Sequence, residues 1–400
     1  MKENNKKFKY DPWIFYPYLF LSLLGILMVY SASANVTLDD KYAASPIDYL
    51  IRQIGYFLVG LFLIFIFAHL KFSFLKQGRV TNSYILVVLI LLLFLIIQKV
   101  IYPQRVINGA SAWIKMGPIN LQPSEFAKLG IILYLARMLA KREKKLTWKT
   151  MKKSIMGPLL FSFFIMSLVL LQPDTGGALS LFLITLMVVS ISGIPWYIGA
   201  GSVILIVAIL SGIISFIAHL YTKGALGKIP YQVLRVIAFV DPWKNSGSAG
   251  IQLTNSYFAI NNGGWLGVGI GNSIQKHGYL PEANTDFILA IIAEEMGVVT
   301  VILILIAIFM IITRAVILAI RSKNNYYAMI CIGVATTFFT QTVFNVGGVA
   351  GLLPITGVTL PFISYGGSSI LLLSIELGLL FHISNEDHQR RIEAKIISND

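Results

Sequence analysis

The chain has 400 residues, of which 56% are hydrophobic and 12% are charged, about half the charged share of a soluble domain. This composition excludes a soluble globule and a disordered chain, and the single cysteine, Cys331, excludes an internal disulfide framework. The net charge of +14 lies in short segments between apolar runs, which is typical of membrane topology signals and not of nucleic-acid binding.

A helix needs about 20 apolar residues to cross the hydrocarbon core, and the apolar runs predict an all-α polytopic membrane protein with about ten transmembrane helices. The predicted spans are 13–33, 49–69, 82–101, 124–140, 155–172, 177–193, 197–219, 285–313, 326–346 and 365–384. The sequence Ala32-Ser33-Ala34 fits a signal-peptide cleavage site, but the long apolar run before it favours a retained first helix.

Lysine and arginine gather in the segments that are cytoplasmic if the N-terminus is inside, most densely over 137–153. This run is a topology determinant that also attracts anionic membrane lipid. We therefore expect one transmembrane domain over residues 1–400, with a cytoplasmic N-tail 1–12, extracellular loops 98–123, 220–284 and 347–364, and a cytoplasmic C-tail 385–400. Since long loops in a compact membrane protein are usually functional, we expect the chemistry to face outwards.

The first long outer loop leads into a helix that should start at Pro123 or Ser124, because serine can cap a helix and proline lacks a donor. Glu125 lies in the first turn, where the helix dipole favours an anion, and Lys128 shares its face. The two residues form either a local ion pair or part of a polar pocket that offers Lys128 to an anion. Ionisable groups within a membrane are functional candidates by default.

The turn Gln172-Pro-Asp174-Thr-Gly-Gly177 favours a capping role for Asp174 at the next helix. The loop 220–284 carries Arg235 and the series Gly267-Val-Gly-Ile-Gly271. Those glycines lack the offset and the βαβ unit of a nucleotide-binding fingerprint, so we interpret them as a flexible loop.

The loop 220–284 leads into the eighth span at Thr285 and Asp286. Either residue can be the N-cap of that helix, while Asp286 is equally suited to be a general base whose pKa is set by a partly dry site. Glu294 and Glu295 follow within the helix, and we expect them to bond to other helices or to water. The segment Leu353–Ser369 forms a shaped outer loop whose small residues favour close helix packing.

These motifs together resemble the SEDS family, the polytopic proteins of cell-wall synthesis typified by FtsW, RodA and SpoVE, over nearly the whole chain. Details of the segment 255–283 are more similar to the FtsW branch than to the RodA branch. The matching blocks are Gly109-Ala110 with Trp113, Gln122-Pro-Ser-Glu125 with Lys128, Gln172-Pro-Asp174-Thr-Gly-Gly177, Leu280-Pro-Glu-Ala-Asn-Thr-Asp286-Phe and Pro361-Phe-Ile-Ser-Tyr-Gly-Gly-Ser-Ser369.

The resemblance implies a ten-helix peptidoglycan glycosyltransferase that polymerises lipid II at the outer face of the cytoplasmic membrane and releases undecaprenyl diphosphate. It implies Asp286 as the catalytic acidic residue and functional roles for Trp113, Glu125 and Lys128. To these substrate-binding candidates we add Gln122, Ser124, Arg235, Glu282 and Thr285. Many members carry a basic residue just before the tryptophan, whereas this chain has Ser111 and Ala112. Lys115, Arg105 or Arg235 would then have to compensate for that missing cation.

The mechanism that we expect has Asp286 as general base, Lys128 as the first candidate cation for the leaving diphosphate and Arg235 as the second. A divalent cation, Mg²⁺ or Mn²⁺, could bridge the phosphates, although no carboxylate cluster in the sequence requires one. The resemblance further implies a class B penicillin-binding protein and other divisome proteins as partners, and a bacterial division septum as location. The alternatives are an elongation polymerase like RodA, a lipid II flippase, and a division scaffold without activity.

Overall fold

The computed structural model describes residues 9–34, 45–70, 72–101, 112–116, 119–140, 148–192, 196–223, 231–245 and 250–399. Each predicted span corresponds to one long helix, which confirms the all-α class. These helices are α1 (Pro12–Ala32), α2 (Pro46–His69), α4 (Gly78–Ile101), α5 (Pro123–Ala140), α6 (Trp148–Leu171), α7 (Thr175–Ser190), α8 (Trp196–Thr222), α11 (Ile288–Arg321), α12 (Asn325–Val349) and α13 (Gly367–Asn399).

Among the described residues, seven helices are long and apolar enough to cross a membrane. The apolar part of α6, Ile155–Leu171, and helix α7 are shorter. Helix α5 has 18 residues but carries Glu125, Lys128 and Arg137. A helix with three ionisable groups can cross a membrane when those groups face the bundle interior, and the buried pair described below meets that condition for two of them.

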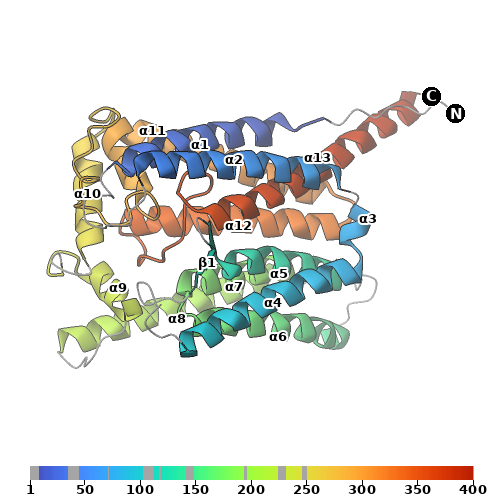
Figure 1. The fold of residues 1–400 in the computed structure, drawn as a ribbon. Coiled ribbons are helices and arrows are strands. Elements are labelled where there is room, and N and C mark those ends of the chain that lie inside the picture. Colours follow the sequence, from blue (N-terminus) through green and yellow to red (C-terminus); the bar gives the residue numbers. More distant parts are fainter. Residues whose placement is uncertain are drawn as a thin grey trace.

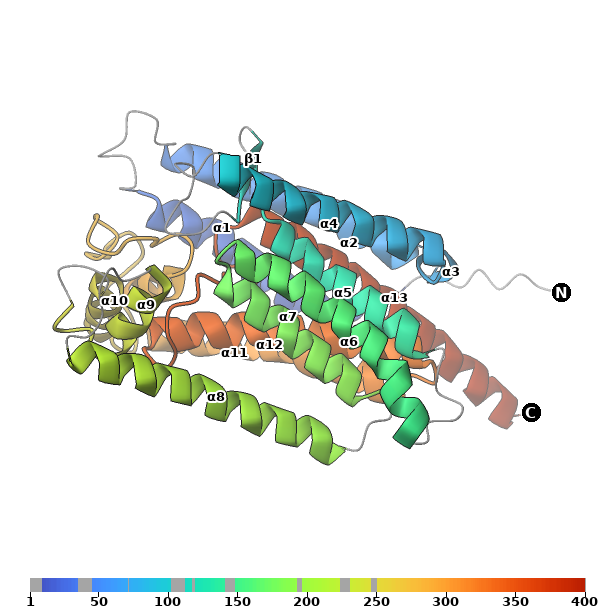
Figure 2. The ribbon, with the colours of Figure 1, turned by 90° about the horizontal axis from the view of Figure 1, so that it is seen from below.

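The long helices run side by side along a common direction (Figures 1 and 2). Helix α1 begins at the end of the bundle where α13 leaves it, and Asp11 Oδ2 accepts bonds there from Arg314 Nε at 2.6 Å and Ser384 Oγ at 2.5 Å. The short helices α9 (Tyr231–Val240) and α10 (Ile251–Gly263) lie at the opposite end. The start of α1 and the end of α13 therefore lie on one side of the bundle, and the positive-inside distribution predicts that the α9 and α10 end faces outwards.

The outer loops contain more regular structure than the sequence analysis expected. The segment 220–284 holds α9 and α10 instead of being loop throughout, and the chain before α5 forms a hairpin of β1 (Ile114–Met116) and β2 (Ile119–Leu121). A strip of apolar residues on α9, with Ile237 and Ala238 buried, packs this helix against the protein. Helix α13 also continues through the predicted tail, to Asn399.

Helix α11 is interrupted at Gly297, whose φ of 80° favours glycine. The backbone N–H groups of Val268 and Gly269 donate to the carbonyls of Glu294 and Glu295, both at 2.9 Å, so the glycine loop fills the break. The Glu295 carboxylate accepts bonds from Ser31 of α1 and, at 2.7 Å, from Lys276 Nζ, as expected for a bond to another helix. The Glu294 carboxylate also bonds to another helix as expected, since it accepts from Asn262 of α10 at 2.8 Å, and it accepts further bonds from loop residues. The loop that leads to Asp286 is thereby fixed to the bundle.

Candidate functional site

A cavity of about 290 Å³ opens at the α9 and α10 end of the bundle, between the outer loops. Six of the residues that the sequence nominated line it, although they are spread over more than 170 positions. They are Trp113, Gln122, Arg235, Glu282, Thr285 and Asp286. The three remaining nominated residues, Ser124, Glu125 and Lys128, do not line the cavity.

Asp286 is half-buried in the cavity wall, in the turn that leads into α11. The prediction that Thr285 or Asp286 caps this helix is wrong: the N-cap is Phe287, and no side chain bonds to the helix end. The Thr285 hydroxyl instead donates to Glu282 Oε2 at 2.7 Å. The carboxylate of Asp286 is therefore not used as a cap, and it remains available to the cavity.

The pKa of Asp286 is raised to about 7, chiefly because burial disfavours the charged carboxylate. The negative charge of Glu282 raises this pKa further, and the positive charge of Arg235 lowers it. A carboxyl group that titrates near neutral pH can accept a proton from a bound molecule and later release it.

Arg235 reaches the cavity from α9 and donates from Nη1 to the Ile355 carbonyl at 3.3 Å. Gly357 lies between this arginine and Asp286, because a Cβ at Gly357 would be 3.4 Å from Arg235 Nη1 and 3.5 Å from Asp286 Oδ2. The φ of Gly357 is +77°, a conformation that glycine adopts without strain. The guanidinium and the carboxylate thus face the same small volume.

The hairpin before α5 supplies a second cation and an aromatic wall. Trp113 is exposed and lines the cavity together with Lys115 of β1. Lys115 is paired with Asn120 across the hairpin, and Asn120 also lines the cavity. Arg105 and Ser111 lie outside the described residues, whereas Ala112, which occupies the position of the missing cation just before Trp113, is buried.

Asp174 caps α7 as predicted, since its Oδ1 accepts a bond from the Gly177 N–H at 2.7 Å. Its Oδ2 accepts bonds from Gln122 Nε2 at 3.1 Å and from Ser124 Oγ at 2.6 Å. Asp174 therefore joins the start of α5 to the start of α7 at the floor of the cavity. Ser124 does not line the cavity, and its link to the site is this hydrogen bond to Asp174.

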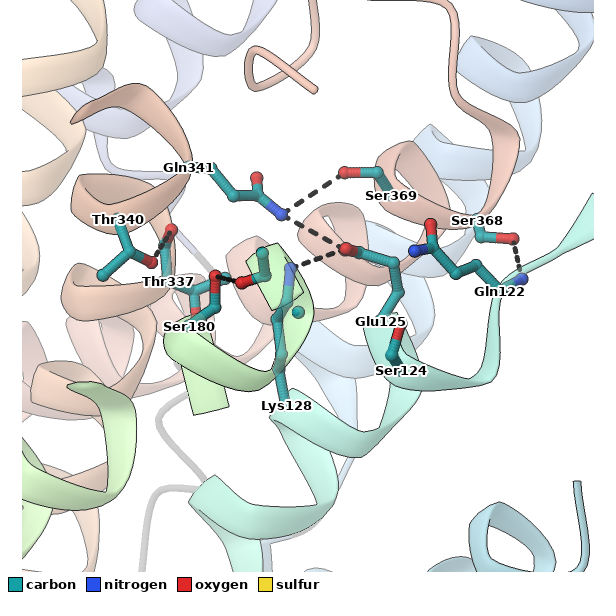
Figure 3. A network of polar contacts seen from close by, with 12 residues as sticks. Gln122, Ser124, Glu125, Lys128, Ser180, Thr337, Thr340, Gln341, Ser368 and Ser369 are labelled. Carbon is teal, nitrogen blue, oxygen red and sulfur yellow. Dashed lines mark hydrogen bonds and ion pairs between the residues drawn. The ribbon is translucent and has the colours of Figure 1, made fainter. Parts of the chain in front are cut away.

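Glu125 and Lys128 form a buried ion pair beneath the cavity, with Lys128 Nζ 2.6 Å from Glu125 Oε1 (Figure 3). Lys128 is 0% exposed. The second carboxylate oxygen of Glu125 accepts a bond from Gln341 Nε2 of α12 at 3.1 Å. Of the two interpretations left open by the sequence, the structure therefore has the local ion pair, and a role of Lys128 toward an anion stays a prediction.

Several residues in and behind the cavity wall were not predicted. Asn345 of α12 donates from Nδ2 to the Asp286 carbonyl at 2.8 Å, and Ser364 Oγ donates to the Thr285 carbonyl at 2.7 Å. Gly366 and Gly367, which were assigned to packing, line the cavity itself, and Gly367 lies against the ring of Tyr56. The sequence signal for Asn345 was a polar residue on a helix face that should be buried. The helical periodicity of α12, however, does not show which loop covers that face.

Side chains in the described part of the chain do not gather into a metal site, since no three His, Cys, Asp or Glu residues lie close enough together to hold an ion. The donor set thus does not by itself fit a resident divalent cation.

Comparison with known proteins shows similarity along nearly the whole chain. A family model described as "Cell cycle protein", covering FtsW, RodA and SpoVE, matches residues 12–389. A Lactococcus lactis relative named "Probable peptidoglycan glycosyltransferase FtsW" is 36% identical, with 95% of this chain and 93% of the relative covered. A Bacillus subtilis relative of the same name is 34% identical, with 94% and 90% covered.

Solved structures show the same similarity in three dimensions. The rod shape determining protein RodA of Thermus thermophilus matches with a TM-score of 0.62 at 27% identity, covering 94% of this chain and 97% of that one. A chain from work on "polymerization and crosslinking by a peptidoglycan synthase complex" matches with a TM-score of 0.68 at 27% identity, covering 96% and 100%.

Proposed function

The chain belongs to the FtsW, RodA and SpoVE family of cell-cycle proteins, and from that premise we propose that it is a peptidoglycan glycosyltransferase that polymerises lipid II. The observation that carries this proposal is Asp286, a half-buried carboxyl group with a pKa of about 7 that faces a cavity shared with Arg235. A glycosyl transfer to a sugar hydroxyl needs such a base, because the hydroxyl must lose its proton as it attacks.

In the proposed reaction the 4-hydroxyl of an acceptor lipid II attacks the anomeric carbon of the growing glycan. The oxygen–carbon bond forms, the bond to the diphosphate breaks, and Asp286 takes the hydroxyl proton. An α-linked donor gives a β-linked product, so a single inversion is sufficient. Undecaprenyl diphosphate leaves with the electron pair of the broken bond.

The leaving diphosphate gains negative charge as its bond breaks, and preorganised cations stabilise that charge. Among the described residues, Arg235 and Lys115 are the cations that line the cavity, so we move the diphosphate role from Lys128 to these two. Trp113 offers an aromatic face to a sugar ring. The prenyl chain needs apolar surface. Helix α8 lies at the edge of the bundle (Figure 2) and carries exposed apolar residues such as Ile204, Leu205 and Phe216 along its length.

Replacing Arg235 by Ala should lower the polymerisation rate by about 10²–10³-fold, the usual loss when one preorganised donor to a developing charge is removed. The measurement is steady-state glycan formation by the purified variant. Lys244→Ala is the matched control, since its side chain is 79% exposed and pairs with Asp241 outside the cavity. A loss of similar size in both variants would contradict the assignment.

The rate should rise with pH through about 7, since Asp286 must lose its proton before it can act as a base. Glu282→Gln removes a negative charge that raises the pKa of Asp286, so the midpoint of the profile should move to lower pH. Arg235→Gln removes a positive charge that lowers this pKa, so the midpoint should move to higher pH. Rate–pH profiles of the three proteins check the signs, and shifts in the same direction would contradict the role of Asp286.

The proposal extends to partners and location. A class B penicillin-binding protein would crosslink the new strand, which is supported by the similarity to a chain from a synthase complex that couples polymerisation and crosslinking. The FtsW relatives support a place at the division septum with other divisome proteins. The proposed steps use only groups of the chain and the substrates, and a titration of activity with EDTA and added Mg²⁺ or Mn²⁺ would test whether a divalent cation takes part.

A direct experiment tests the function. Purified protein in liposomes should convert lipid II to glycan strands and release undecaprenyl diphosphate. Movement of labelled lipid II between leaflets without polymer would instead support a flippase, and neither activity would support a scaffold. A fluorescent fusion that decorates the side wall and not the septum would support an elongation polymerase like RodA.

A further inference from the structure

Asn345 of α12 joins the two loops that form the cavity wall. Its Nδ2 donates to the Asp286 carbonyl at 2.8 Å and to the Val358 carbonyl at 2.9 Å. The residue is only 3% exposed. Asp286 lies in the turn before α11 and Val358 in the loop between α12 and α13, so one side-chain amide holds both loops at a fixed distance from α12.

The orientation of this amide is set by its surroundings. Both contacts are to carbonyl oxygens, which can only accept, so the group that faces them must be the NH₂. Within the described residues, Asn345 Oδ1 is buried and has no hydrogen-bond partner. Burying the unpaired Oδ1 acceptor costs free energy. The two bonds that Nδ2 donates to the loops are what this position gives Asn345 in return.

Asn345 is the last member of a polar stripe on α12 whose other members are Thr337 and Gln341, spaced four residues apart and therefore on one face. Thr337 Oγ1 donates to Glu376 Oε1 at 3.3 Å, and Gln341 donates to Glu125 (Figure 3). The buried Glu125–Lys128 pair thus holds α12 one turn away from the amide that holds Asp286.

We propose that Asn345 is a positioning residue for the glycosyl transfer, which fixes the Asp286 carboxylate at the height of the cavity by holding the carbonyl of the same residue. The inference rests on the proposed role of Asp286 as base. Without the amide, the turn at 284–287 keeps its own bonds, the bond from Ser364 to the Thr285 carbonyl, and two bonds at Asn284, from the Tyr365 N–H to its carbonyl at 2.9 Å and from its Nδ2 to Ser33 Oγ at 3.0 Å. None of these bonds reaches the Asp286 carbonyl. A displacement of about 1 Å in a reacting group can cost about 10²-fold in rate.

The charges that face Asp286 do not change when Asn345 is replaced by an uncharged residue. Among the described residues that line the cavity, the charged groups other than Asp286 are Arg235 of α9, Glu282 of the same turn, Lys115 of β1 and Asp174 before α7, and the phenols of Tyr56 and Tyr365 also titrate. A change in the pH profile of an Asn345→Leu variant therefore reports a changed position of Asp286 and not a changed set of charges.

The experiment compares purified Asn345→Leu and Asn345→Asp with wild type in lipid II polymerisation. Both substitutions keep the approximate volume and remove the donor, and an ionised aspartate at this position would in addition repel the two carbonyls. We expect kcat to fall by about 10–100-fold with KM for lipid II changed less than about threefold. In Asn345→Leu the pH midpoint should move down, because a loosened Asp286 would be better hydrated and easier to ionise. Asn345→Ser, smaller and still polar, is used with the same expectation if the other variants do not fold.

Thr342→Val is the matched control, since Thr342 is also buried on α12 but its hydroxyl bonds only to the Phe338 carbonyl of the same helix. A folded Asn345 variant with wild-type kcat and midpoint would overturn the proposal. The proposal would also be overturned if kcat fell equally in the Asn345 variants and in Thr342→Val while the midpoint of the pH profile stayed unchanged. That result would indicate a general loosening of α12. The Asp286→Asn variant separates the two levels: if it is active, the base assignment fails, and if it is inactive while Asn345→Leu is normal, only the positioning role fails.

Discussion

Asp286→Asn is expected to lower lipid II polymerisation by about 10³-fold or more, with the protein still folded and inserted in the membrane. The substitution keeps the size of the side chain and removes its ability to accept a proton, and a positioned general base contributes about 10²–10⁴-fold to a rate. Folding should be preserved because Asp286 is tied to the protein through its carbonyl, which accepts from Asn345 at 2.8 Å, and not through a capping carboxylate.

The measurement is glycan formation from lipid II by purified protein in liposomes, with melting temperature and gel filtration as checks on folding. Asp241→Asn is the control, because this carboxylate pairs with the exposed Lys244 outside the cavity. Asp286→Asn should still bind lipid II, since Arg235, Lys115 and Trp113 remain at the cavity. Wild-type turnover in the Asp286 variant would remove the basis of the proposed mechanism.

Much of the fold could be predicted because the membrane leaves few choices. Apolar length alone located every long helix, and the start of α5 at Pro123 followed from the chemistry of Pro and Ser at a helix end. Six of nine nominated residues line the cavity, since ionisable residues at the outer ends of spans have little reason to be there except to face a polar space.

The sequence could not predict which element covers a given face. The spacing of Glu125 and Lys128 places them on one side of α5, but the ion pair is sealed by Gln341 of α12, which lies more than 200 positions away. The same limit hid Asn345, since only the three-dimensional packing brings α12 against the turn at Asp286. Helices α9 and α10 were missed because short helices lying outside the membrane are not apolar throughout.

Replacing Lys128 by Ala is expected to destabilise the protein by about 3–5 kcal/mol, the usual cost of removing one partner of a buried ion pair. Glu125 would be left with a charge that only Gln341 Nε2 contacts, at 3.1 Å, in a site where it is 6% exposed. Thermal unfolding in detergent measures the loss, and activity should fall with it. Lys76→Ala is a control, because that lysine lies over the ring of Tyr327 and has no carboxylate partner in the structure's described part.

The double variant Glu125→Gln with Lys128→Met decides between the two roles of the pair. It removes both charges together, so no buried charge is left uncompensated, and such replacements are often neutral or stabilising. If the pair acts only by holding α5 against α12, stability and polymerisation should both recover relative to Lys128→Ala. If Lys128 instead contacts the diphosphate in a rearranged state, stability should recover while the rate stays about 10²–10³-fold low. Because Lys128 is fully buried and outside the cavity, we expect the first result, and the second would restore the cation to the reaction.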